Sequence, residues 1–223
     1  NALMNCRFLL RISMSSSIGR LMLRFSITMK ILLLARCLCC TLMMPATSLA
    51  SDGLLTTEID RVEAYLNSVR TLEARFVQSN SDGTYAEGKL YLQRPGLMHF
   101  KYDPPVPLQL YAEGNTLTHV DTELKQVSYY PLDESPLYFL LGERISLQEG
   151  LSIKAFKRQN KVIRVELFDD RSPDMGSVTL TISEQPMQLR SWTVTDAQGL
   201  RTDLALVEAR FGVEIDPNIF LFV

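Results

Sequence analysis

The hydrophobic pattern after Arg70 is the feature that most constrains the fold. From there on, apolar and polar residues alternate with a period of two, as in Leu72, Ala74 and Phe76, which are separated by charged residues. A period of two places successive side chains on opposite faces of an extended strand. About eleven such segments follow one another at short, even spacing, which predicts an all-β barrel or sandwich.

The strand segments are separated by residues that favour turns. Pro95-Gly96 predicts a tight turn, because proline presets φ and glycine accepts the positive φ that follows. The predicted strands are Leu72–Phe76, Tyr85–Gln93, Leu97–Tyr102, Leu108–Ala112, Thr116–Val120, Gln126–Tyr130, Leu151–Lys157, Lys161–Phe168, Ser177–Ser183, Leu189–Asp196 and Leu200–Arg210.

Two segments have a helical pattern instead. A long amphipathic helix is predicted before the strands, with Asp52 or Thr56 as its N-cap. Its apolar stripe consists of Leu55, Ile59, Val62, Leu66 and Val69. A short helix is predicted over Leu137–Leu141, with Ser135 as cap, Pro136 at its first position and Gly142 at its end. This short apolar helix suits a core position and a lid over a pocket equally well.

The first fifty residues differ in composition from the rest. They hold six basic residues, no acidic residue and all four cysteines. Met29-Lys30, the apolar run Ile31–Met44 and Ser48-Leu49-Ala50 match the three parts of a secretory signal peptide, which predicts cleavage after Ala50. Residues 1–50 are therefore expected to be an upstream extension and signal peptide, and residues 51–223 a single β-domain in the periplasm.

Composition then limits the functions open to the mature domain. Removing the six basic residues leaves 17 basic against 25 acidic residues, a formal net charge of −8, which argues against a nucleic-acid partner. The only two histidines, His99 and His119, lie beside charged or polar neighbours and are expected at the surface. The acidic run Asp169–Asp174 lacks the spacing of a calcium loop and predicts a solvated turn. We expect no cofactor, no metal site and no enzymatic activity.

An eleven-stranded barrel has a bore wider than its own side chains can fill, since about eight strands already suffice. Either the sheet flattens into a sandwich, or it encloses an apolar cavity lined by Met98, Phe100, Leu180, Trp192 and their neighbours. The residues alone leave these alternatives open. They also favour an exposed turn position for Arg94, just before Pro95.

The residues that carry a family resemblance are concentrated around this arginine. Residues 88–100 (GKLYLQRPGLMHF), together with Tyr102, the downstream GNTL at 114–117, FVQ at 76–78 and SPLYFLL at 135–141, resemble the periplasmic outer-membrane lipoprotein carrier family (LolA). The likeness extends over residues 54–211. It implies a half-open antiparallel β-barrel of about eleven strands, with an N-terminal helix and a short helical lid over an apolar cavity.

The resemblance also implies a function and a site. Such a carrier takes lipoprotein acyl chains from an inner-membrane lipoprotein-releasing ABC transporter and passes them, as a monomer, to an outer-membrane receptor. Arg94 occupies the position of the arginine that holds the empty carrier closed against its lid. The cavity is expected to be lined by Leu90, Leu92, Met98, Phe100, Tyr102, Leu137, Phe139, Leu140, Leu180 and Trp192.

Two alternatives stay open beside the lipoprotein carrier. The first is a periplasmic lipid-binding sensor, or a carrier for a different lipid. Sensors with this half-barrel usually have an additional domain, for which 173 mature residues leave no room. The second is a β-sandwich enzyme, which lacks any recognisable nucleophile or metal set.

Overall fold

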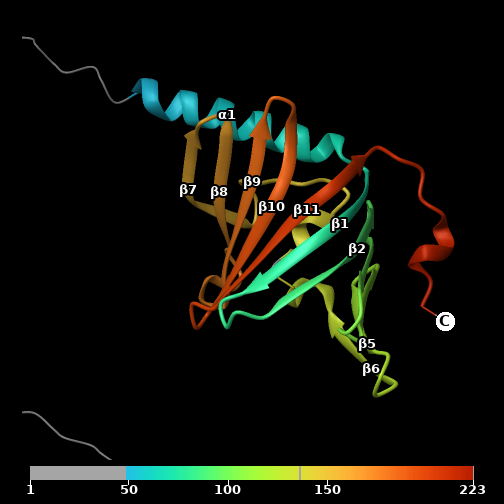
Figure 1. Cartoon of the computed structure of the whole chain (residues 1–223). Helices are drawn as coiled ribbons and strands as arrows, with labels where there is room; N and C mark the ends of the chain where they lie inside the picture. The colour runs from blue at the N-terminus through green and yellow to red at the C-terminus, as the bar shows by residue number, and fades with distance from the viewer. Residues whose placement is uncertain (1–48, 136, 223) are drawn as a thin grey trace, which may run out of the picture. The chain divides into compact units, whose positions relative to one another are not determined.

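The computed structural model describes residues 49–135 and 137–222, and within them eleven strands form one antiparallel sheet that does not close (Figure 1). The strand order is β6-β5-β4-β3-β2-β1-β11-β10-β9-β8-β7. The predicted half-open barrel is therefore confirmed, and the two-layer sandwich is not formed. The division of the chain after Ala50 stays a prediction, because the signal-peptide residues before Leu49 lie outside the described residues.

Each predicted strand overlaps an observed one, with ends that differ by a few residues. The strands are β1 (Thr71–Asn80), β2 (Tyr85–Gln93), β3 (Leu97–Tyr102), β4 (Leu108–Glu113), β5 (Thr116–Asp121), β6 (Gln126–Pro131), β7 (Leu151–Gln159), β8 (Val162–Asp169), β9 (Gly176–Glu184), β10 (Met187–Asp196) and β11 (Arg201–Phe211). The helix α1 (Leu49–Ser68) precedes them, and the short 3₁₀ helices are η1 (Leu132–Glu134), η2 (Tyr138–Leu141), η3 (Pro173–Met175) and η4 (Pro217–Phe220).

Helix α1 crosses one end of β7–β10 (Figure 1). The predicted apolar stripe is correct in its middle, since Ile59, Val62 and Leu66 are buried, but Leu55 is 41% exposed. The predicted cap is wrong, because the helix begins at Leu49 and so contains both Asp52 and Thr56. Asp52 and Thr56 have side chains that favour the N-cap position, but the helix already includes both residues.

The lid segment differs from its prediction in detail. Its helical part is a 3₁₀ turn that begins at Tyr138, with Leu137 as N-cap and no side-chain cap, and it ends before Gly142 as predicted. Ser135 is therefore not the cap, and the predicted first position, Pro136, lies outside the described residues. A wholly apolar stretch of four residues can form only one 3₁₀ turn, and its position is set by what it packs against.

The β1–β2–β3 region is packed around a glycine. Gly88 of β2 pairs with Phe76 on one side and Tyr102 on the other. A Cβ at this position would lie 2.7 Å from the Phe76 ring and would also collide with the backbone oxygen of Lys101. The ring occupies the space that a side chain would need, and Phe76 itself is fully buried. Only glycine fits here.

Gly88→Ala should therefore lower the free energy of unfolding by about 1–3 kcal/mol, the usual cost of overpacking a core. Gly53→Ala is the matched control, because a Cβ at that helical position meets nothing within 4 Å. That change should raise stability by roughly 0.5–1 kcal/mol. Urea denaturation measures both. Equal effects of the two substitutions would contradict the close packing at Gly88.

The C-terminal segment changes the expected environment of His99. The 3₁₀ helix η4 packs on β3 and β4, on the sheet face opposite Met98 and Phe100, and beneath it His99 is only 6% exposed. Its ring stacks on Tyr111 at 4.1 Å between centroids, and Nε2 donates to Gln109 Oε1 at 3.0 Å. The predicted surface position is wrong for His99, because a segment more than a hundred residues away covers it. His119 on β5 is half-buried.

Burial lowers the pKa of His99 below its ordinary 6.5, so the folded state disfavours its protonation. The unfolded chain then binds more protons between the lowered pKa and 6.5, and stability falls as the pH decreases through that window. Urea denaturation at pH 7.5 and pH 5 should show a smaller loss of stability for His99→Phe than for the wild type. An unchanged loss in His99→Phe would contradict this account.

Candidate functional site

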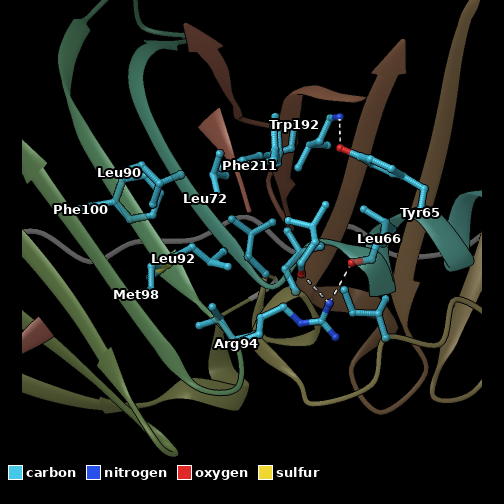
Figure 2. Close-up of a pocket in the computed structure, with 16 residues that line it drawn as sticks. Tyr65, Leu66, Leu72, Leu90, Leu92, Arg94, Met98, Phe100, Trp192 and Phe211 are labelled. Carbon is cyan, nitrogen blue, oxygen red and sulfur yellow. Dashed lines mark hydrogen bonds between the residues drawn. The ribbon is translucent and has the colours of Figure 1, made fainter. Parts of the chain in front are cut away.

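The concave side of the sheet holds an apolar cavity (Figure 2). Only Tyr65 and Arg94 contribute charged or hydroxyl groups to its wall. The lining residues are Tyr65, Leu66, Val69, Leu72, Leu90, Leu92, Arg94, Met98, Phe100, Leu137, Leu140, Leu141, Ile145, Leu189, Trp192 and Phe211. They come from the end of α1, from five strands and from the lid, so closing this cavity requires all three parts of the fold.

The wall follows from the strand register. Leu90 pairs with Phe100 and Leu92 with Met98, so each pair places two side chains on the same inner face. Phe100 meets Phe76 edge to face at 5.2 Å and Trp192 at 6.4 Å between ring centroids. These contacts connect β3 across the concavity to β10. The strand side of the wall is therefore braced by ring contacts as well as by the sheet, whereas the lid side consists of a single 3₁₀ turn.

The cavity is small in this state, with a volume of about 40 Å³. A space of that size holds about three waters. Its lining offers waters almost no hydrogen-bonding partner, so this is a small apolar space. Leu137, Leu140 and Leu141 are the lid side chains that line it. A larger apolar ligand enters only if these side chains move out.

Arg94 joins the end of β2 to the lid and to α1. Its Nε donates to the Gly142 carbonyl at 2.8 Å and its Nη2 to the Glu143 carbonyl at 3.0 Å. Its Nη1 donates to the carbonyls of Leu66 and Val69 at 2.8 and 3.1 Å. Figure 2 shows the guanidinium pointing from the strand end toward Leu66. Arg94 is 6% exposed, so the exposed turn position favoured by the residues alone is wrong.

The acceptors of Arg94 are unusual for a buried arginine. Its hydrogen-bond acceptors are four backbone carbonyls and the Asn67 side-chain oxygen at 3.3 Å, and none is a carboxylate. Leu66 lies in the last turn of α1, where its carbonyl also accepts from Val69 N at 3.3 Å and the helix dipole favours a cation. Burial lowers the pKa of Arg94, and nearby Arg70 lowers it further. The charge is thus held by neutral dipoles, which water can replace when the lid opens.

Other hydrogen bonds hold the lid in the same place. Gly96 N donates to the Leu141 carbonyl at 2.9 Å, directly connecting the Pro95-Gly96 turn to η2. Asn67 Nδ2 donates to the Ile145 carbonyl at 2.7 Å, and its oxygen accepts from Ile145 N at 2.8 Å. Arg94 is therefore the centre of a closed arrangement in which the strand turn, the helix end and the lid end meet.

The predicted lining residues occupy different places in the structure. Leu90, Leu92, Met98, Phe100, Leu137, Leu140 and Trp192 line the cavity. Tyr102 lines a neighbouring cavity that shares Phe100 and Trp192 with the first. Its hydroxyl donates to Gln78 at 2.8 Å, and burial raises its pKa to about 12. Phe139 faces away, into a separate recess, and Leu180 is fully buried in the core of the sheet.

Sequence reasoning missed some of the lining. Tyr65 lies beside the predicted helix stripe, and its hydroxyl accepts from Leu189 N at 2.7 Å. Ile145 follows the lid in an irregular segment with no periodic signal. Phe211 ends the last strand, where the alternation stops. The helix stripe pointed to Leu66 and Val69, but periodicity gave no reason to place a helix end against a strand turn.

The other polar clusters do not form a recognisable reactive site. Among the described residues, no group of three or more His, Cys, Asp or Glu side chains is arranged for a metal ion. The predicted solvated turn after β8 contains Arg171, which contacts Asp169 at 2.6 Å. Nor does any helix in the described ranges have the length and apolar character to cross a membrane.

The sequence matches a known protein family over most of the chain. The sequence model of the outer membrane lipoprotein carrier protein LolA matches residues 67–223. This chain belongs to the LolA family. The relatives of known name include an outer-membrane lipoprotein carrier protein of Chromohalobacter salexigens, 29% identical over 82% of this chain and 88% of that protein. One of the same name from Methylococcus capsulatus is 27% identical over 75% of this chain and 84% of that protein.

Solved structures with a similar fold are more distant in sequence. A LolA superfamily protein from Nitrosomonas europaea has a TM-score of 0.44 at 10% identity, covering 74% of this chain and 97% of that one. The Mycobacterium tuberculosis lipoprotein LppX has a TM-score of 0.38 at 11% identity, covering 74% of this chain and all of that one. The assignment to the LolA family rests on the sequence match.

Arg94→Leu should loosen the lid, because it removes every donor that Arg94 gives to Gly142, Glu143 and the end of α1. Hydrogen exchange of residues 138–147 is expected to accelerate about tenfold or more, since a charged donor contributes about 1.5–3 kcal/mol per bond. Arg75→Leu is the matched control, because Arg75 pairs with Glu87 and Asp103 away from the lid. Equal protection of the lid in wild type and Arg94→Leu would show that Arg94 does not hold it.

Proposed function

We propose that this protein is a periplasmic carrier that binds the acyl chains of lipoproteins and moves them from the inner to the outer membrane. The observation that supports it most directly is an apolar cavity held shut by one buried arginine in a chain of the LolA family. The named relatives are outer-membrane lipoprotein carrier proteins, which supports the same cargo.

The chemistry of the lining fits acyl chains and little else. A hydrocarbon chain needs no hydrogen-bonding partner, and the cavity wall offers almost none. Burying such a chain contributes about 0.8 kcal/mol per methylene group. Several long chains in a rigid apolar pocket would then bind too tightly for release, and a carrier needs a term that opposes binding.

The closed lid supplies that opposing term. Because Leu137, Leu140 and Leu141 form the lid side of a small cavity, cargo enters only after the bonds of Arg94 with Gly142 and Glu143 break. The free energy of closing is subtracted from the affinity for cargo, as for any ligand that binds a minor conformation. A protein tuned in this way accepts cargo from a stronger donor and yields it to a stronger acceptor.

The proposal includes the two exchange partners and the route of export. An inner-membrane ABC transporter that releases lipoproteins loads the carrier, and an outer-membrane receptor unloads it. The predicted signal peptide takes the chain to the periplasm, where it acts as a monomer. The carrier performs no covalent chemistry, so the acyl chains pass through unchanged.

A release assay tests the proposal. The purified mature protein is incubated with energised inner-membrane vesicles that contain a radiolabelled lipoprotein, and the soluble fraction is collected. We expect lipoprotein to be released in a one-to-one complex with the carrier. Binding of free lipid without lipoprotein release would favour a carrier for another lipid instead, and no binding of either would refute the proposal.

Arg94→Leu should separate loading from unloading. With the lid bonds lost, the variant should accept lipoprotein at least as well as wild type but pass it to outer-membrane vesicles at least tenfold more slowly, because closing no longer drives release. Arg75→Leu should load and unload normally. Transfer by Arg94→Leu at the wild-type rate would show that the arginine has no part in unloading.

A further inference from the structure

The lid has a second face, opposite the cavity. Phe139 of η2 points into a recess between η1 and the ends of β7–β10, whereas Leu137 and Leu140 line the cavity. The recess has a volume of about 890 Å³, and both apolar and charged residues line it. The lid therefore separates a nearly filled apolar cavity from a wide, open recess.

One arginine on the rim of this recess contacts both short helices before β7. Arg171, in the turn after β8, lies over the Tyr138 ring of η2 at 4.5 Å from its centroid. Its Nη1 is 3.8 Å from Asp133 Oδ2 of η1. Its position is fixed by Asp169, which accepts from Nη2 at 2.6 Å and from Nε at 3.1 Å.

These contacts occur at the opposite end of η2 from Arg94. Tyr138 is the first residue of the turn, and the carbonyl of Gly142, which follows its last residue, accepts from Arg94. The turn is thus tied at its end to β2 and α1, and at its start to the strand hairpin β8–β9. A segment fixed at one end only could swing aside, so its position over the cavity depends on both.

We propose that Arg171 is a second positioning residue for the lid, which holds its N-terminal end closed and controls access to the cavity from the recess. This inference rests on the proposed carrier function. The two arginines differ in environment: Arg94 is buried, whereas the Arg171 side chain is about half exposed. Exposed ion pairs and cation–π contacts are weak, so the Arg171 end opens more readily than the Arg94 end.

A purely local role for Arg171 gives a different expectation. If it only stabilises the turn after β8 through Asp169, its loss changes the turn and leaves the lid unaffected. If it holds the lid, its loss must raise the affinity of the cavity for an apolar ligand, because closing competes with binding. Ligand affinity therefore distinguishes the two roles, whereas thermal stability does not.

The test measures binding of a fluorescent long-chain fatty acid to the full mature protein. Arg171→Gln and Tyr138→Leu remove the contact from either side, and Tyr138→Leu keeps an apolar residue on the lid. We expect each to bind the probe roughly threefold to tenfold more tightly than wild type at low salt. Arg201→Gln is the matched control, because Arg201 pairs with Asp203 on β11 at 3.1 Å. This variant should bind the probe with the wild-type affinity.

Arg94→Leu serves as the reference for an opened lid. If it binds the probe more tightly than wild type while Arg171→Gln and Tyr138→Leu both match wild type, the second positioning residue is refuted and the carrier function stands. If even Arg94→Leu binds no probe, the apolar ligand itself is wrong and the carrier proposal fails. Tighter binding by the double variant Arg94→Leu/Arg171→Gln than by either single variant supports two independent points of closure.

Discussion

The guanidinium of Arg94 is the interaction on which the closed structure depends. Its hydrogen bonds join a strand end, a helix end and a lid end that are far apart in sequence. Each acceptor is a neutral oxygen, and three of them also accept from a second donor: the Leu66 carbonyl from Val69 N, the Glu143 carbonyl from Arg70 and the Asn67 oxygen from Ile145 N. These bonds hold the lid closed over the apolar cavity. When they break, no buried carboxylate is left unpaired.

This arrangement follows from a sheet that cannot close. Eleven strands curve around a space too wide for their own side chains, and the β6 and β7 edges stay apart within the described chain. Helix α1 and the segment between β6 and β7 fill part of that space. Because the lid is only a 3₁₀ turn with apolar side chains, it can be replaced there by another apolar group of suitable shape.

The strand pattern was predictable where a strand has one buried face, as β1, β2, β8 and β9 do. β2 was predicted with its observed bounds, Tyr85–Gln93, and the shared inner face of Met98 and Phe100 followed from the period of two. Long-range packing was not predictable from single strands. His99 is covered by η4, a contact that its own strand pattern does not indicate. Leu180 lies on the inner face beside its partner Trp192, as the pattern predicts, but it is fully buried there and does not line the cavity.

The role of Arg94 shows the same limit more sharply. An arginine before a Pro-Gly turn has the local sequence of an exposed residue, and only its family resemblance pointed to the lid. Its burial depends on carbonyls of Leu66 and Gly142, and backbone carbonyls leave no signature in a sequence. Side chains that bond to backbone are therefore the part of such a site that structure adds.

Double spin labelling tests the central claim, that the empty protein is closed and opens to admit acyl chains. Residues 51–223 contain no cysteine, so in a protein of these residues labels placed at Lys101→Cys on β3 and Glu143→Cys beside the lid are unique. Pulsed electron paramagnetic resonance should give one narrow distribution of the distance between the two labels without ligand. When a diacylated lipopeptide is bound, the distribution should shift to longer distances. The same distribution with and without bound lipopeptide would contradict the account.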